Sequence, residues 1–340
     1  MNDLDAAKLA GWLATVLPDG GGPLLIDKFA GGQSNPTYKV TQGRHAMVLR
    51  RKPFGTLLPS AHAIEREYRL IAALHPTGFP APRAIALCED PSVIGAPFYL
   101  MTLVEGRNLW DGTLPATPHE ERRPLYAAMI DTLAALHTLD PQALGLADFG
   151  RPGNYFARQV ERWTRQYRSA QTEEIAEAER LIEWLPATLP AQDRTSIIHG
   201  DYRIDNLIFA PDAPEIAAVL DWELATIGDP LADFAYLAMN WTMPADGRAG
   251  LSGIDLEAAG IPTLDEAVAR YCAATGRDDL PDLHWYFAYN LFRLMAIVQG
   301  IKKRLIEGNA AIAQAGQTVA RLMPLAQAAW AQARLAGATG

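Results

Sequence analysis

The 340-residue chain contains 39 acidic and 30 basic side chains, which gives a net charge of −9 and a pI near 5.3. Lys and Arg are scattered rather than gathered into a stripe, so the charge pattern excludes a typical nucleic-acid-binding protein. A hydrophobic fraction of 49% excludes a disordered chain, and the length predicts two lobes or domains, each with a core of its own.

Cysteine usage and the N-terminal segment predict a cytosolic protein. Cys88 and Cys272 stand far apart with no CxxC motif, so neither a disulfide framework nor a zinc site is indicated. No basic segment followed by an apolar one opens the chain, and no window approaches the roughly 20 apolar residues that cross a bilayer. We therefore expect a cytoplasmic protein without a membrane partner.

Residues 1–104 are predicted to form an α+β lobe that binds nucleotide. Helical spacing of apolar residues predicts a leading helix over residues 4–17 and a second helix over residues 61–74 with Ser60 as its N-cap. β-like runs occupy residues 24–29, 37–40, 45–50, 84–88 and 98–104. The order β-β-β-α-β-β predicts a small antiparallel sheet that begins with a meander and carries one main helix.

Residues 105–340 are predicted to form a larger, mainly helical lobe that holds the catalytic loop and the acceptor site. Helical patterns cover residues 124–139, 155–167, 172–185, 264–272 and 283–306. Two short β-like runs, at residues 196–199 and 216–220, interrupt the helices. The most polar and patterned segment of the chain lies between and after these two runs.

This polar segment carries the pattern on which the functional prediction depends. It reads HGDYRIDNLIF from His199 to Phe209, and a strand-like run then ends at Asp221. Here the chain resembles the aminoglycoside phosphotransferase and choline-kinase-like branch of the protein-kinase-like superfamily. Protein kinases of the same superfamily have the catalytic loop HRDxxxxN. Asp201 and Asn206 keep the spacing of that loop, and Gly200 replaces its Arg. The resemblance implies a protein-kinase-like bilobal fold, ATP as co-substrate and Mg²⁺ as cofactor.

The resemblance also implies a role for each polar residue of this segment. Asp201 would accept or orient the proton of an acceptor hydroxyl, while Asn206 and Asp221 would be ligands of Mg²⁺, a cation that prefers oxygen ligands. Trp222-Glu223 stands where protein kinases have Phe-Gly. Scaffold roles rather than direct chemistry are expected for His199, for Asp229 as a helix N-cap, and for Asp233.

Two segments of the first lobe are expected to contact the nucleotide. GGQSN lies between two predicted strands, and its backbone amides and hydroxyl predict phosphate contacts at Gly32, Ser34 and Asn35; a plain hairpin turn is the alternative. The strand that leaves the lobe exposes amide and carbonyl groups that suit an adenine edge. The predicted purine contacts are Thr102, Leu103 and Val104.

Arg50 stands where protein kinases place the phosphate-clamping Lys. Arg forms planar bidentate pairs and is not equivalent to Lys, so Arg51 or Lys52 could share the role. The expected partner of Arg50 on the following helix is Glu67, with Glu65 as the second choice. A solvated helix face is the other interpretation of Glu67.

The sequence predicts the type of reaction in more detail than the chemical identity of the acceptor. HGDYRIDNLIF, DWELATIGDPLADFAYL and NLFRLMAIVQGIKKR are similar to the kinase-like domains fused to some acyl-CoA dehydrogenases. That resemblance points to a hydroxylated metabolite such as a hydroxyacyl-CoA rather than to an aminoglycoside. Trp285, Tyr289 and Arg293 share one face of a predicted helix and could line an acceptor cleft, or else pack in the core.

Two other classes of function compete with an ATP-dependent phosphotransferase. A pseudokinase that only binds nucleotide or metabolite is kept open by Arg50, although Asp201, Asn206 and Asp221 argue for an enzyme. A metallohydrolase built on His199 would need further His ligands, and the sequence clusters none nearby. The preference for ATP over GTP and the oligomeric state are not predicted.

Overall fold

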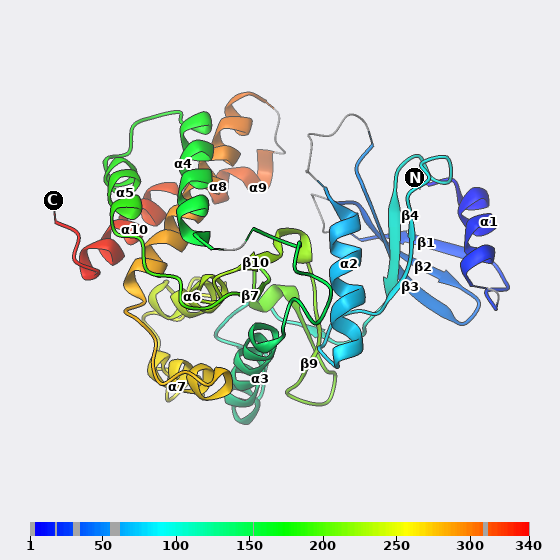
Figure 1. The fold of residues 1–340 in the computed structure, drawn as a ribbon, viewed down its shortest axis with the longest axis horizontal. Coiled ribbons are helices and arrows are strands. Elements are labelled where there is room, and N and C mark those ends of the chain that lie inside the picture. Colours follow the sequence, from blue (N-terminus) through cyan, green and yellow to red (C-terminus); the bar gives the residue numbers. More distant parts are fainter. Residues whose placement is uncertain are drawn as a thin grey trace. The chain divides into compact units, whose positions relative to one another are not determined.

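The computed structural model describes residues 4–17, 19–29, 35–54, 62–151, 153–308 and 312–339, with the backbone alone for 312–315. The chain forms two compact units (Figure 1). The first unit comprises Met1–Trp110, Pro141–Phe149 and Ile204–Ala225, and the second comprises Asp111–Asp140, Gly150–Arg203 and Thr226–Gly340. The first unit thus takes in two segments from far beyond residue 104, and the domain boundary expected there stays a prediction.

The first unit contains a five-stranded antiparallel sheet in the order β1-β2-β3-β5-β4. Its elements are α1 (Ala6–Val16), β1 (Leu24–Lys28), β2 (Thr37–Gln42), β3 (His45–Arg51), α2 (Ile64–Leu74), β4 (Ala84–Cys88) and β5 (Phe98–Thr102). Leu9 and Leu13 of α1 are buried against Tyr38, Leu49 and Phe98 of the sheet. The predicted order β-β-β-α-β-β and the opening meander are confirmed.

The predicted start of α2 is wrong. The helix begins at Ile64 with Ala63 as its N-cap, and Ser60 lies outside the described residues. His62 has a left-handed backbone with a φ of 58°, a conformation that a right-handed helix cannot contain, so the helix begins only after it.

A smaller sheet completes the first unit. It consists of β6 (Arg107–Asn108), β8 (Leu207–Phe209) and β9 (Ile216–Val219) in the antiparallel order β6-β8-β9. The backbone N–H of Val219 donates to the carbonyl of Pro80, which joins β9 to the chain ahead of β4. Three 3-10 turns, η1 (His75–Thr77), η2 (Ile204–Asn206) and η3 (Trp222–Leu224), also belong to this unit. The unit therefore holds Asn206 and Asp221 on short elements rather than on long ones.

The second unit is mainly helical. Its elements are α3 (His119–Thr138), α4 (Tyr155–Ala170), α5 (Ala176–Ala187), β7 (Ser196–Ile198), β10 (Thr226–Gly228), α6 (Leu231–Ala238), η4 (Met239–Thr242), α7 (Leu264–Thr275), α8 (His284–Ile306), α9 (Ile312–Val319) and α10 (Leu322–Leu335). α8 packs against α4, α6 and α10, and most of its residues from Trp285 to Gln299 are buried. β7 pairs with β10 just before the catalytic-loop segment begins.

Two further sequence predictions are tested by the second unit. α3 begins at His119, five residues earlier than predicted, because Pro124 lies inside the helix and not at its first position. Within the described residues, no helix combines the length and the apolar character of a membrane-crossing segment. The cytoplasmic location stays a prediction.

Candidate active site

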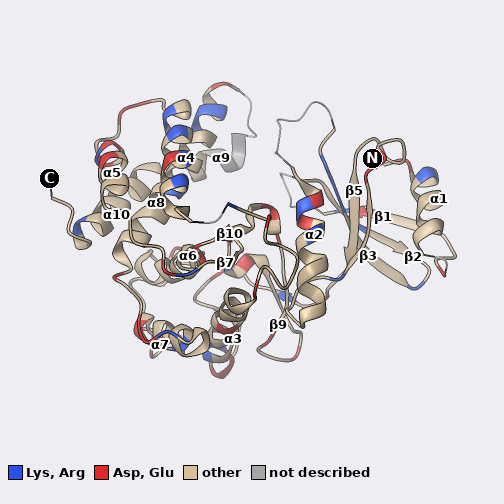
Figure 2. Cartoon of the chain, in the orientation of Figure 1, with Lys and Arg blue, Asp and Glu red and all other residues tan. Residues whose placement is uncertain are grey.

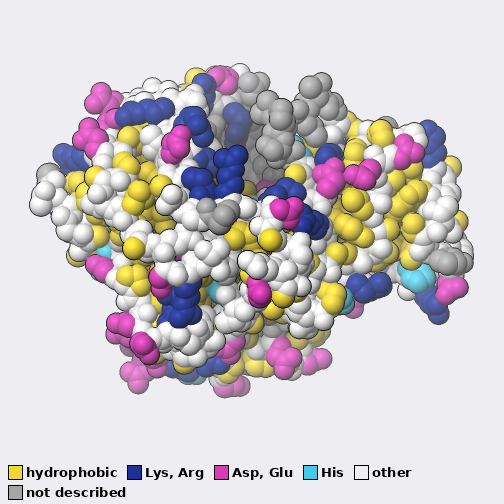
Figure 3. Space-filling model, viewed as in Figure 1, with side chains coloured by type: hydrophobic (Ala, Val, Ile, Leu, Met, Phe, Trp, Pro, Cys, Tyr) yellow, Lys and Arg dark blue, Asp and Glu magenta, His cyan; other side chains and the backbone are white. Residues whose placement is uncertain are grey.

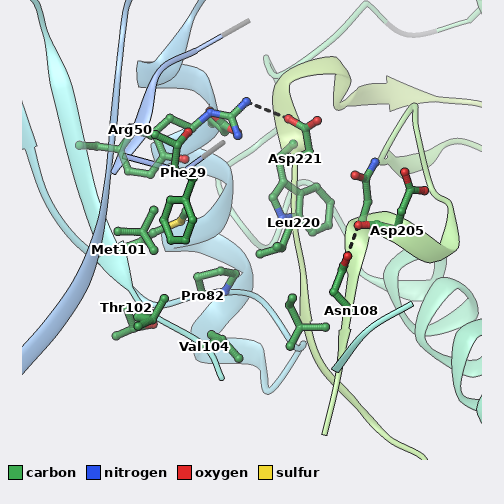
Figure 4. Close-up of a pocket in the computed structure, with 18 residues that line it drawn as sticks. Phe29, Arg50, Pro82, Met101, Thr102, Val104, Asn108, Asp205, Leu220 and Asp221 are labelled. Carbon is green, nitrogen blue, oxygen red and sulfur yellow. Dashed lines mark hydrogen bonds and ion pairs between the residues drawn. The ribbon is translucent and has the colours of Figure 1, made fainter. Parts of the chain in front are cut away.

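The first unit contains a cavity of about 480 Å³, within the size range of small-molecule sites. Phe29, Val48, Met101, Ile208 and Leu220 give it apolar walls, and its polar lining includes Arg50, Glu67, Asn206 and Asp221 (Figure 4). All of these residues belong to the first unit. The fold thus brings most of the predicted nucleotide and metal residues to one cavity, although they are spread over more than 150 positions of the sequence.

The end of β5 lines this cavity with Thr102, Leu103 and Val104. The N–H of Thr102 donates to the carbonyl of Arg83 at 3.0 Å, and that of Leu103 donates to Ala46 at 3.4 Å. Among the described residues, no acceptor takes the N–H of Val104. Val104 is therefore the backbone donor best suited to an adenine edge, and purine contact by these three residues stays a prediction.

Arg50 on β3 makes the ion pair with α2 that the sequence predicts. Its Nε lies 3.1 Å from Oε2 of Glu67, and both side chains are almost fully buried. The second-choice partner Glu65 pairs with Lys52 instead. Arg51 donates to the Tyr38 hydroxyl and to the carbonyl of Lys52, so Arg51 and Lys52 are engaged away from Glu67.

Arg50 also binds two carboxylates that follow β9. Its Nη2 lies 2.8 Å from Oδ1 of Asp221 and 3.3 Å from Oε2 of Glu223. Figure 4 shows the Arg50 guanidinium reaching across to Asp221. Asp221 has a left-handed backbone, with φ 63° and ψ 60°, which an Asp tolerates better than most residues and which turns the chain sharply after the strand. Sequence reasoning missed the contact with Glu223. The signal that could have found it is the presence of an acidic residue, Glu223, where protein kinases have the Gly of their motif.

The charges around Arg50 perturb one another. Burial raises the pKa of Glu67 to about 7, although the positive charge of Arg50 acts in the opposite direction. Burial alone would lower the pKa of Arg50, but the nearby Glu67 and Asp221 outweigh it and raise that pKa. The Tyr99 hydroxyl donates a further hydrogen bond to Glu67. Arg50 therefore stays cationic, while Glu67 titrates close to neutral pH.

Asn206 and Asp221 are placed by backbone hydrogen bonds. The N–H of Leu220 donates to the carbonyl of Asn206 at 2.8 Å, so the residue before Asp221 is tied directly to Asn206. Asn108 on β6 donates its side-chain amide to the carbonyls of Asp205 and Leu207, at 2.9 and 3.2 Å, on either side of Asn206. Sequence reasoning missed Asn108, because a two-residue strand gives no periodic pattern.

The donor set of this cavity fits Mg²⁺. Asn206 offers an amide oxygen and Asp221 a carboxylate, and magnesium usually takes one or two protein oxygens and completes its shell with water and substrate phosphates. Across the described part of the chain, no three His, Cys, Asp or Glu side chains are arranged to hold a metal ion. The assignment of Asn206 and Asp221 as metal ligands stays a prediction.

The glycine-rich segment of the first unit is only partly described. Gly32 and Ser34 lie outside the described residues, so their phosphate contacts stay predictions. Asn35 is buried, and its Oδ1 lies 3.0 Å from Nδ1 of His62. The Asn35 side chain is thus engaged by the residue that precedes α2, and a role in nucleotide binding stays a prediction for it as well.

The predicted catalytic loop begins in the second unit, where Asp233 of α6 holds its backbone. The carboxylate of Asp233 accepts hydrogen bonds from the N–H groups of His199, at 2.5 Å, and Gly200, at 2.8 Å. Burial alone would raise the pKa of Asp233, but His137 and the hydrogen bonds from the loop outweigh it and lower that pKa. Nδ1 of His199 accepts the N–H of Asp201. Asp233 and His199 thus hold the loop by hydrogen bonds as expected, and the prediction that neither takes part in the chemistry directly stays a prediction.

Asp229 differs from its predicted role. The N-cap of α6 is Pro230, so Asp229 lies one residue ahead of the cap. Its Oδ1 still accepts the N–H of Leu231, at 2.9 Å, in the first turn of the helix. The side chain therefore satisfies one of the amides that a helix N-terminus leaves open, from outside the helix.

The three predicted acceptor residues lie on α8, where all of them are buried. Trp285 stacks on Tyr289 with an interplanar angle of 7° and donates its indole N–H to Thr188. Arg293 donates from Nη2 to the carbonyl of Gly200. These contacts agree with the core-packing alternative, and acceptor binding by the three residues stays a prediction.

The expectation that Lys and Arg are scattered is wrong for the second unit, where cationic side chains gather on two helices although the chain as a whole is acidic. Arg158, Arg162, Arg165 and Arg168 lie along α4, and Lys302, Lys303 and Arg304 lie near the end of α8 (Figure 2). Figure 3 shows Lys and Arg side chains collected over these two helices. Next to Asp201, Nε of Arg203 lies 3.2 Å from Oδ2 of the carboxylate. The predicted catalytic acid thus has Arg203 as a cationic neighbour, and α4 and the end of α8 carry further cations in the same unit.

Comparison with known proteins identifies the family and the fold. A model of the phosphotransferase enzyme family matches residues 26–286. The chain belongs to this family. A putative aminoglycoside phosphotransferase from Ralstonia eutropha JMP134 has the same fold, with a TM-score of 0.89 and 44% identity over 98% of this chain and 99% of that one. A ternary complex of the aminoglycoside phosphotransferase APH(4)-Ia with AMP-PNP and hygromycin B, at 14% identity and a TM-score of 0.62, shares the fold. The predicted α+β, protein-kinase-like fold is confirmed.

This phosphotransferase is also similar to parts of longer proteins. Mouse acyl-CoA dehydrogenase family member 10 is 46% identical over 311 residues, which are 91% of this chain and 29% of that protein. Human acyl-CoA dehydrogenase family member 11 is 41% identical over 288 residues, 84% of this chain and 37% of that protein. The chain therefore spans about a third of the length of these relatives. The predicted resemblance to domains fused to acyl-CoA dehydrogenases is confirmed.

Proposed function

We propose that this phosphotransferase moves the γ-phosphoryl group of ATP to a hydroxyl group of a small molecule. The observation that carries the proposal is the cavity of the first unit, where one guanidinium, two metal-type oxygen ligands and an unused backbone donor face a volume suited to a nucleotide. The AMP-PNP bound to a protein of the same fold supports ATP as the donor.

The proposed roles follow from the charge that phosphoryl transfer develops. Val104 and its neighbours hold the purine, and Arg50 faces the phosphates. Asn206 and Asp221 hold Mg²⁺, which when bound neutralises charge on the β- and γ-phosphate oxygens. The acceptor oxygen bonds to the γ-phosphorus as the bond to the β–γ bridging oxygen breaks, and the hydroxyl proton passes to Asp201. Positioning and electrostatics supply the rate, since no covalent intermediate is needed.

An anionic acceptor is the class that the second unit favours. Arg203 contacts Asp201, and α4 adds four arginines to the same unit, of which Arg165 and Arg168 pair with glutamates. Such a surface attracts phosphate or carboxylate groups and repels a polycationic aminoglycoside. The relatives that join this domain to an acyl-CoA dehydrogenase also support a hydroxyacyl-CoA-type metabolite.

An ATP-consumption screen tests the proposal. The purified chain is given Mg-ATP and one hydroxylated compound at a time, including hydroxyacyl-CoA esters, hydroxy acids and aminoglycosides, and the phosphorylated product is identified by mass. We expect transfer to an anionic compound. Asp201→Asn should lower turnover by about 10²-fold or more while nucleotide affinity is retained. Asp212→Asn, which changes an exposed carboxylate, is the matched control.

Two outcomes would count against the proposal. Nucleotide binding in a thermal-shift assay without transfer to any compound would favour a pseudokinase. Full turnover in Asp201→Asn would remove Asp201 from its role, and transfer to aminoglycosides alone would contradict the anionic acceptor.

A further inference from the structure

Tyr236 lies on the same helix as Asp233 and reaches the catalytic loop beside it. The two residues are three positions apart on α6, so their side chains project from one face. Asp233 binds the backbone of the loop, whereas the Tyr236 hydroxyl donates a hydrogen bond to the carboxylate of Asp201. The Tyr236 side chain is buried. α6 therefore holds both the backbone of the catalytic loop and the side chain of Asp201.

Arg293 holds the loop from α8. Its Nη2 donates to the carbonyl of Gly200 at 2.5 Å, and its guanidinium lies 5.0 Å from the centre of the Tyr236 ring and 5.5 Å from that of Trp163. Within the described residues, no ion pair joins Arg293 to a carboxylate, and Arg293 is 7% exposed. A buried charge without an ionic partner is unfavourable unless hydrogen bonds and aromatic faces offset it. The hydrogen bond that offsets the cost of burying the Arg293 charge is made to the catalytic loop, at the carbonyl of Gly200.

These contacts fix the peptide group that precedes Asp201. The carbonyl of Gly200 is held by Arg293, and the N–H of Asp201, which belongs to the same peptide group, is held by His199. Gly200 has a φ of +83°, a region that is open to glycine and in which the adjoining peptide can rotate easily. Holding both ends of this peptide prevents its rotation, and with it a change in the direction of the Asp201 side chain.

We propose that Tyr236 and Arg293 are positioning residues that hold the Asp201 carboxylate in one orientation for the transfer step. The inference rests on the proposed phosphotransfer function. Arg203 also touches Asp201, but its side chain is 44% exposed, so this contact constrains the carboxylate less than a buried one does. Burial and the charge of Asp201 both raise the pKa of Tyr236, so its hydroxyl stays a donor at physiological pH.

The expected effect is a loss of kcat without a loss of nucleotide binding. A misplacement of a catalytic group by about 1 Å lowers the rate by about 10²-fold. We therefore expect kcat to fall by about 10- to 100-fold in Tyr236→Phe, while KM for ATP stays within twofold. The ATP cavity is lined by neither Tyr236 nor Arg293, which is why the two parameters should separate.

The test compares Tyr236→Phe with Tyr126→Phe, using the acceptor found in the screen. Tyr126 is also buried and donates its hydroxyl to a backbone carbonyl, that of Gly112, so the control loses a similar hydrogen bond away from the loop. In an Asp201→Asn background, Tyr236→Phe should cause no further loss of kcat, because the two residues act through one carboxylate. Equal losses of kcat in Tyr236→Phe and Tyr126→Phe would overturn the proposal for Tyr236.

Arg293 is tested by a conservative pair of variants. Arg293→Lys keeps one donor for the Gly200 carbonyl and should retain more kcat than Arg293→Met, at an unchanged KM for the acceptor. A raised acceptor KM with unchanged kcat would instead make Arg293 an acceptor-binding residue and overturn the positioning role.

If the unmodified chain transfers phosphate to no compound, the proposed function itself fails. If that chain is active and Tyr236→Phe keeps its kcat, the inference alone fails.

Discussion

The ion pair between Arg50 and Glu67 makes the free energy of unfolding depend on pH. The substitution Arg50→Met should change that dependence. Arg50→Met removes the charge and keeps much of the side-chain volume, so Glu67 is left 3% exposed without its cation. Removing one partner of a buried pair costs about 3–5 kcal/mol when the other must stay ionised. Glu67 can avoid part of that cost by taking up a proton, because burial has already raised its pKa to about 7 from an ordinary value of 4.5.

The sign of the pH effect follows from this shift. A carboxyl group whose pKa is raised on folding lowers stability as pH rises from its unfolded pKa to its folded pKa. In the wild type this loss slows through pH 7, where Glu67 is about half ionised, and ends above it. Without Arg50 the folded pKa of Glu67 is higher still, so the loss continues above pH 7 at about 1.4 kcal/mol per pH unit. The stability gap between wild type and Arg50→Met should therefore widen from pH 7 to pH 9.

Denaturant unfolding at pH 6, 7, 8 and 9 measures this gap. Arg50→Met combined with Glu67→Gln removes the titrating group, and its gap from the wild type should not widen above pH 7. Arg44→Met is the matched control, since Arg44 pairs with Asp19 at 3.0 Å on the exposed surface and should contribute less than about 1 kcal/mol at every pH. A gap for Arg50→Met that is constant from pH 7 to pH 9 would refute the reasoning.

Two further substitutions test how the loops are held. Asp233→Asn leaves one oxygen for two backbone N–H groups, at 2.5 and 2.8 Å in the wild type, so unfolding should require about 2–4 kcal/mol less, and an unchanged thermal midpoint would contradict the scaffold role. Asn108→Ala removes two hydrogen bonds around Asn206 and should weaken binding of an ATP analogue by about tenfold in calorimetry. This corresponds to about 1.4 kcal/mol of binding free energy, lost because Asn206 is held less firmly. Asn108→Asp should weaken it more than Ala does, because a carboxylate would face two carbonyl oxygens; an Asp variant that binds better than Ala would argue against this contact.

Much of the first unit could be predicted because its elements carry strong local signals. β-like runs at residues 37–40 and 45–50, with Gln42-Gly43 between them, predict adjacent strands of an antiparallel meander, and the structure pairs β2 with β3 from Thr37 with Arg50 to Gln42 with His45. The start of α2 was missed because the left-handed backbone of His62 leaves no signal in hydrophobic periodicity. β6 was missed because a strand of two residues is too short for a pattern to repeat.

The sequence by itself determined the family and the reaction class, because the spacing of Asp201, Asn206 and Asp221 reflects a chemical requirement that tolerates little change. It also determined that Glu67 was the first candidate to pair with Arg50. Only the tertiary structure decided that Arg50 binds Asp221 and Glu223 as well, and that Arg293 turns to the carbonyl of Gly200. These contacts join residues about 90 to 170 positions apart. The direction of a buried side chain depends on which elements pack around it, and hydrophobic periodicity carries no record of that.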